Sequence, residues 1–222
     1  MTEEEWLTAT DPTPMLEFLR DGEDDRRLRL FAVSCCQKIW HLLGDDRSKR
    51  AVTVAEMFAE GKATFQKLSD AFDEGEEATD ELFRKNDVVG CNSAAAAACT
   101  SGGGGEGWKV PVAHVVSNAL SAWKDATGHS DEALRGELVR LLRDIFGNPF
   151  RPVTVDPDWL TTDVAALARG IYDERVFDRM PILADALQDA GCDNDDILNH
   201  CRDASQVHVR GCWVIDLLTG RE

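Results

Sequence analysis

Cysteine and histidine gather near the C-terminal end of the chain, where their side chains have the chemistry to bind a metal ion. The candidate ligands are Cys192, His200, Cys201, His208 and Cys212. Zinc prefers four thiolate or imidazole ligands in a tetrahedron, and short paired spacings help to assemble such a site. The stretch therefore makes zinc the candidate cofactor, although its spacing matches no standard zinc finger.

The spacing also limits which of these side chains can meet. His208 and Cys212 are four residues apart, so they would share one face if the last helix began at His208. The adjacent residues His200 and Cys201 cannot both point in one direction on a regular helix.

Two other interpretations of the same residues stay open. Cysteines are often small buried side chains, and histidines are favoured near helix C-termini by the helix dipole. Alternatively, a pair such as His200 with Cys212, or His208 with Cys201, can supply a base and a nucleophile, provided that the thiol pKa is lowered. No nucleophile-elbow motif accompanies either pair, and we predict no catalytic or cofactor-binding residue beyond the metal candidates.

A second group consists of Cys35, Cys36 and His41. Cys35 falls on the apolar stripe of a predicted helix, and Cys36 is a helical neighbour of Trp40, so packing explains both cysteines. The alternative is that Cys36 and His41 join a long-range site with the C-terminal cluster.

Helical patterning dominates the elements that must position these residues. Apolar periodicity and cap signals predict an all-α, irregular bundle of about ten helices, some of them short. Thr2 and Glu5 form a capping box for the first helix. Leu134–Ile145 carries a helical apolar stripe, a short helix is predicted to end near His200, and a last one fits Cys212–Leu218.

The middle of the chain departs from this pattern. A short helix that starts near Phe65 is predicted to close near Gly75, and a further acidic helix is predicted over residues 76–85. Five alanines then precede four glycines, which predicts a Gly-rich linker near 101–107. We therefore expect a helical region over 1–100, a flexible linker over 101–110 and a helical region over 111–222, or one compact domain overall.

Charge and composition restrict the class of protein. The 222 residues contain 41 acids and 24 Lys or Arg, which gives a net charge of −17. Nucleic-acid binding needs a basic surface, so it is not expected. No apolar run is long enough to span a membrane, and no secretion signal precedes the first helix, so we expect a cytoplasmic protein with reduced thiols. The acidic region 51–90 is a candidate surface for a partner protein with a basic face.

Three groups of sequence carry a resemblance to a known family. They are MTEEEWL with DPTPMLEFLR and LRLFAVSCCQKIWHLL; LLRDIFGNPFRPV with DPDWL; and IYDERVFDRMPILADALQDAGCDNDDILNHC with HVRGCWVIDLLTGRE. The chain resembles a large paralogous family of uncharacterised proteins associated with planctomycete bacteria. The resemblance implies a cytosolic bacterial protein, and it implies no activity, cofactor or catalytic residue.

The first hypothesis from the sequence is thus a cytosolic, non-catalytic interaction or regulatory module. The alternatives are a zinc-stabilised module that uses the C-terminal cluster and an enzyme that uses a Cys–His pair. The sequence leaves the oligomeric state open.

Overall fold

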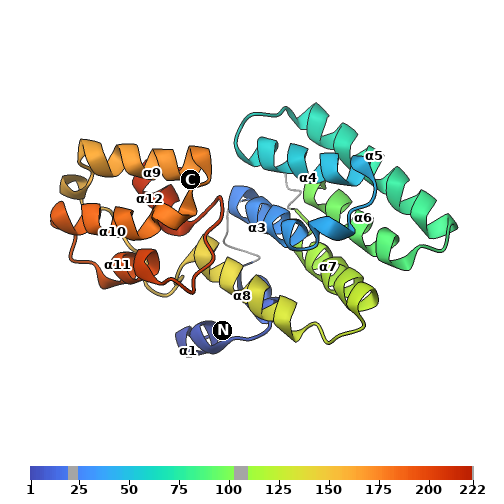
Figure 1. Cartoon of the computed structure of the whole chain (residues 1–222), viewed down its shortest axis with the longest axis horizontal. Helices are drawn as coiled ribbons and strands as arrows, with labels where there is room; N and C mark the ends of the chain where they lie inside the picture. The colour runs from blue at the N-terminus through green and yellow to red at the C-terminus, as the bar shows by residue number, and fades with distance from the viewer. Residues whose placement is uncertain (20–24, 103–109, 222) are drawn as a thin grey trace. The chain divides into compact units, whose positions relative to one another are not determined.

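The computed structural model describes residues 1–19, 25–102 and 110–221, and the regular secondary structure of this part of the chain is all helical (Figure 1). It holds twelve α-helices, three short 3-10 helices and no strand, so the all-α prediction is confirmed. The α-helices are α1 (Glu3–Thr8), α2 (Pro12–Leu19), α3 (Asp25–Lys38), α4 (Asp46–Ala59), α5 (Phe65–Arg84), α6 (Val88–Ser101), α7 (Val112–Thr127), α8 (Glu132–Phe146), α9 (Thr162–Glu174), α10 (Met180–Asp189), α11 (Asp195–Arg202) and α12 (Trp213–Thr219). The 3-10 helices are η1 (Trp40–Leu42), η2 (Pro157–Trp159) and η3 (Phe177–Arg179).

Several helices begin at a side chain that accepts a hydrogen bond from a backbone N–H group of the first turn. The capping box of α1 is confirmed, because the Thr2 N–H donates to Glu5 Oε2 at 2.7 Å and the Glu5 N–H donates to Thr2 Oγ1 at 3.2 Å. Asp45 caps α4 and Thr161 caps α9 in the same manner.

The chain forms two compact units. Unit 1 comprises Ala9–Val139 together with Met1, and unit 2 comprises Thr2–Thr8 together with Arg140–Glu222. The division falls inside α8, so this helix contributes residues to both units.

In unit 1, the alanine-rich helix α6 packs against α4, α5 and α7, and Figure 1 shows it between α5 and α7. Small side chains allow this close approach. A Cβ atom at Gly75 would lie 2.9 Å from the Cβ of Ala98, which is closer than real Cβ contacts allow. The predicted helix end at Gly75 is wrong: α5 continues to Arg84, and the glycine serves interhelical packing instead.

The expected division at residues 101–110 differs from the observed one. Helices α6 and α7 lie on either side of that segment and pack on each other within unit 1. Residues 103–109 of the predicted linker lie outside the described residues. Arg29 donates to the carbonyls of Thr100 and Gly102 at 2.7 and 3.1 Å, and Asp25 accepts from the N–H of Val110 at 3.1 Å. Two residues near the N-terminus of α3 therefore bind the backbone at residues 100, 102 and 110.

Unit 2 is built from α1, the C-terminal end of α8 and helices α9 to α12. Its apolar core takes residues from α9, α10, α11 and α12. Helix α1 is attached to the end of α8, because the Trp6 indole donates to the Gly147 carbonyl at 3.0 Å and Arg143 donates to the Trp6 carbonyl at 2.7 Å. These contacts fix the last turns of α8, which carry the acidic member of the site described next.

Candidate metal centre

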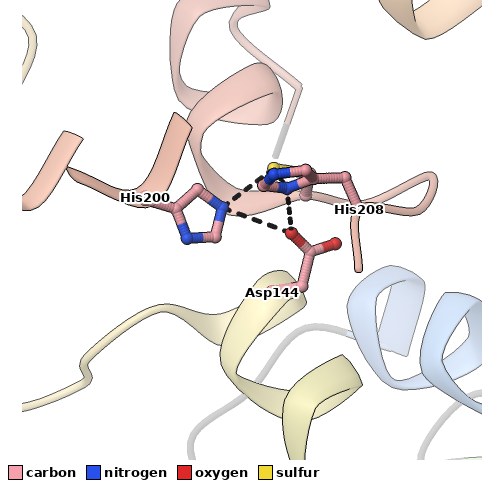
Figure 2. A group of neighbouring side chains, drawn as sticks. Asp144, His200 and His208 are labelled. Atoms are coloured by element: carbon pink, nitrogen blue, oxygen red, sulfur yellow. Dashed lines mark hydrogen bonds and ion pairs between the residues drawn. The ribbon is translucent and has the colours of Figure 1, made fainter. Parts of the chain in front are cut away.

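Four side chains with metal-binding atoms converge in unit 2. One ligand atom from each of Asp144, His200, His208 and Cys212 lies within 4.8 Å of all the others. Figure 2 shows the two imidazole rings turned toward the carboxylate of Asp144, which projects from α8. The side chains of Asp144, His200 and His208 are 0, 10 and 6% exposed, and Cys212 is fully buried. The cluster therefore lies inside the unit.

Each ligand comes from a different part of the local structure. Asp144 lies near the end of α8, His200 lies in the last turn of α11, and Cys212 is the residue that precedes α12. His208 lies in the connection between α11 and α12, which has no helix or strand.

Gly147 and Trp213 bring these parts together. Gly147 follows α8 with φ of 62°, a conformation that favours glycine, and a Cβ there would lie 3.1 Å from the Trp213 ring. The Trp213 ring also lies beside the His200 ring, at a centroid distance of 5.2 Å. Trp213 thus packs between the end of α8 and the histidine at the end of α11.

The distances between the ligand atoms suit an ion with tetrahedral coordination. Asp144 Oδ1 lies 3.2 Å from His200 Nε2 and 2.8 Å from His208 Nδ1. Cys212 Sγ lies 3.3 Å from His200 Nε2 and 3.8 Å from His208 Nδ1. Bonds to zinc of about 2.0–2.1 Å for nitrogen and oxygen and about 2.3 Å for sulfur give tetrahedral edges of about 3.3–3.6 Å. These four of the six separations bracket the edges, and every pair of ligand atoms lies within 4.8 Å.

The carboxylate of Asp144 is held in its ionised form. Burial raises the pKa of this carboxyl, but its contacts with His200 and His208 outweigh burial, and the net shift of the pKa is downward. Its second oxygen, Oδ2, accepts from the backbone N–H of Val209 at 2.9 Å. The Asp144 carboxylate is thus a buried negative charge with one oxygen fixed by a hydrogen bond. Its other oxygen faces the nitrogen and sulfur ligand atoms, so the group is suited to bind a cation.

The thiol of Cys212 experiences the opposite effect. Burial raises its pKa well above the ordinary value, and the negative charge of Asp144 raises it further. A bound cation reverses this, because it replaces the thiol proton and stabilises the thiolate. The Cys212 side chain is therefore expected either as a protonated thiol or as a thiolate bound to a metal ion. A free thiolate is disfavoured at this site.

The structure brings together three of the five predicted ligands. His200, His208 and Cys212 lie in the cluster, whereas Cys192 and Cys201 are buried among apolar side chains of the unit 2 core. His208 and Cys212 meet without sharing a helix, since α12 begins only at Trp213.

Sequence reasoning missed Asp144 entirely. In the sequence this residue is one charged position beside the apolar stripe of a helix, and nothing there marks it as buried. A fully buried aspartate is the signal, and burial becomes visible only once the fold is known.

The second predicted group is placed in unit 1. Cys35 and Cys36 are buried in α3, as the packing interpretation expects, and the ring of His41 contacts the Trp123 ring at a centroid distance of 6.2 Å. None of these residues belongs to the group of four.

Comparison of the chain with models of known families, with curated proteins and with solved structures finds no match. The resemblance to the planctomycete family therefore stays a prediction. Within the described residues, no helix is both long enough and apolar enough to cross a membrane.

Proposed function

We propose that this protein is a zinc-binding module whose ion is held by Asp144, His200, His208 and Cys212. The observation that carries the proposal is the convergence of four different ligand atoms within 4.8 Å in the interior of unit 2. Hydrogen bonds alone account for the cluster less well. His200 Nε2 lies near both Asp144 Oδ1 and Cys212 Sγ, and a neutral imidazole nitrogen carries at most one proton to share between them.

The types of ligand favour zinc among common cations. Magnesium and calcium prefer sites made of oxygen atoms, whereas imidazole nitrogen and thiolate sulfur suit zinc and related transition metals. Two histidines, one cysteine and one carboxylate complete a four-coordinate shell without a water ligand.

A complete and buried shell supports a structural role for the ion. Catalytic zinc sites keep one position open for water or substrate, whereas structural sites fill all four positions with protein ligands. The proposal keeps the non-catalytic character predicted from the sequence and gives the module an ion that ties α8, α11 and α12 together.

The geometry favours this proposal over a Cys–His enzyme. In a nucleophile–base–acid arrangement, the acid contacts the ring nitrogen that does not face the nucleophile. Here Asp144 and Cys212 both face Nε2 of His200, and both also face Nδ1 of His208. The Cys212 thiol is also buried, with a raised pKa.

Metal analysis of the full-length protein, purified without an affinity tag in zinc-supplemented medium, tests the proposal. The expected result is about one zinc ion per chain, with a lower unfolding temperature after chelation. Cys212→Ala should lose the ion, whereas Cys192→Ala, which removes a buried thiol from the same core, should keep it. A zinc content well below one ion per chain, with unfolding that is unchanged by chelator, would contradict the proposal.

A further inference from the structure

The connection between α11 and α12, residues Asp203–Gly211, has little structure of its own. Its backbone bonds include two turn contacts, from the Gln206 N–H to the Asp203 carbonyl and from the Cys212 N–H to the Val209 carbonyl, each at 3.0 Å. Asp203 to Ser205 are exposed, Gln206 to Arg210 are half-buried and Gly211 is buried, and the Arg210 guanidinium lies over the Tyr172 ring at 5.5 Å from its centroid. Few buried apolar contacts and few backbone bonds are the features of segments that open easily.

The connection is tied to α8 chiefly through the candidate metal centre. The Val209 N–H donates to Asp144 Oδ2 at 2.9 Å, and His208 contacts Asp144 Oδ1 at 2.8 Å. A third tie, from the Gln206 side chain to the Arg140 carbonyl, is long at 3.4 Å and exposed. Asp144 is thus the main anchor of this segment on α8.

The neighbouring helices have anchors of their own. In α11, Ile197, Leu198 and Cys201 belong to the apolar core of unit 2. In α12, Val214, Ile215 and Leu218 belong to it as well, and α12 packs on α9. The two helices can stay docked when the connection between them opens.

We propose that the ion acts as a clip that closes Asp203–Gly211 onto α8, so that this segment opens when the ion leaves. The inference rests on the proposed zinc site, and it adds that the site controls one segment rather than the whole unit. Three ligands, His200, His208 and Cys212, lie within or beside the segment, and Asp144 supplies the fixed point. Because the ion needs all four ligands together, it binds the closed form and stabilises it by mass action.

Hydrogen–deuterium exchange on the full-length, untagged protein tests the clip, with zinc as the probe and chelated protein as the reference. With free zinc at about 100 times its dissociation constant, amides that exchange through this opening should slow about 100-fold in residues 203–211. Exchange in α9 and α10 should stay unchanged. His208→Gln should exchange like the chelated protein at every zinc concentration, and His129→Gln, an exposed histidine of unit 1, should behave like the wild type.

The outcomes separate the clip from the zinc site itself. If one zinc ion binds and residues 203–211 exchange equally with and without it, the clip is wrong and the zinc site stands. If chelation accelerates exchange throughout unit 2, the clip is also wrong, because the ion would then support the whole unit. If no zinc binds, the proposed function fails and the clip fails with it.

Discussion

The backbone N–H of Val209 donates to Oδ2 of Asp144 at 2.9 Å and leaves the other oxygen of that carboxylate facing two histidines. This bond determines which oxygen is presented to the site and which one anchors the connection between α11 and α12. Groups that hold a ligand in place in this manner contribute to metal affinity, although they do not touch the ion.

Replacement of Asp144 by asparagine should weaken zinc binding by at least about 10- to 100-fold, because the neutral amide is a poor ligand and the buried charge that attracts the cation is lost. Competition with a chromophoric chelator measures the affinity. Asp185→Asn, which changes an exposed aspartate of α10, is the matched control and should bind zinc like the wild type. Equal affinity of Asp144→Asn and the wild type would remove Asp144 from the site.

Zinc should protect the thiol of Cys212 from alkylation. In the zinc-free protein, opening of the connection exposes this thiol and allows it to react, whereas the bound ion occupies its sulfur. Cys201 should react slowly in both states, because it stays buried in the core with α11, and burial raises its pKa to about 12. Cys91 is half-buried and lies in unit 1, so its alkylation rate should be the same with and without zinc. Mass spectrometry of each labelled cysteine over time gives the rates, and a Cys212 rate unaffected by zinc would count against its role as a ligand.

The sequence could predict part of this site but not all of it. The density of cysteine and histidine located the cluster, and the rule that neighbours on a helix point apart predicted that His200 and Cys201 would separate. The sequence could not show which of the two faces the cluster. Burial of Asp144 depends on contacts between α8 and a segment more than 60 positions later, and a local pattern contains no trace of such contacts.

Contacts between distant residues also explain why the role of Gly75 could not be predicted from the sequence. Glycine often ends a helix, so its position predicted a break, whereas the structure uses its missing side chain for contact with Ala98 of α6. The helix propensity of one residue was outweighed by packing between two helices distant in the sequence.

Gly75→Ala should therefore destabilise unit 1, although alanine is the better helix former. Overpacking against Ala98 should cost about 1–3 kcal/mol. Gly136→Ala in α8 is the matched control, because its new Cβ would meet no atom within 4 Å. That change should stabilise the protein by about 0.5–1 kcal/mol through helix propensity. Denaturant unfolding of both variants measures the two effects, and stabilisation by Gly75→Ala would show that α5 and α6 are not packed as described.

Arg135 should make part of the stability depend on pH. It pairs with Asp11 and Asp131 at 3.0 and 2.9 Å. Burial raises the pKa of Asp11, but the hydrogen bonds from Thr13 and the charge of Arg135 outweigh burial, so the net shift of this pKa is downward. The pKa of Asp131 is lowered mainly by the hydrogen bond from Arg135. A lowered carboxyl pKa contributes stability that is present above the unfolded value of about 3.9 and is lost as the pH falls through the folded value.

Arg135→Gln should therefore be less stable than the wild type at pH 7, by at most about 1 kcal/mol because these pairs are partly exposed to solvent. The difference should begin to shrink as the pH falls toward the unfolded carboxyl pKa of about 3.9, and it should disappear only below the lowered folded pKa values of Asp11 and Asp131. Denaturant unfolding of the two proteins across this range gives the difference directly. A difference that stays constant on acidification would mean that Arg135 stabilises the protein by packing rather than by charge.

The most direct test of the zinc site is X-ray absorption at the zinc edge of the loaded, untagged protein, because it reports the atoms bound to the ion. The predicted shell has one sulfur at about 2.3 Å and three nitrogen or oxygen atoms at about 2.0–2.2 Å. The sulfur should disappear in Cys212→Ser and remain in Cys192→Ala. A shell without sulfur, a shell with two or more sulfur atoms, or a six-coordinate shell of oxygen atoms would contradict the assignment of Asp144, His200, His208 and Cys212 as the ligands.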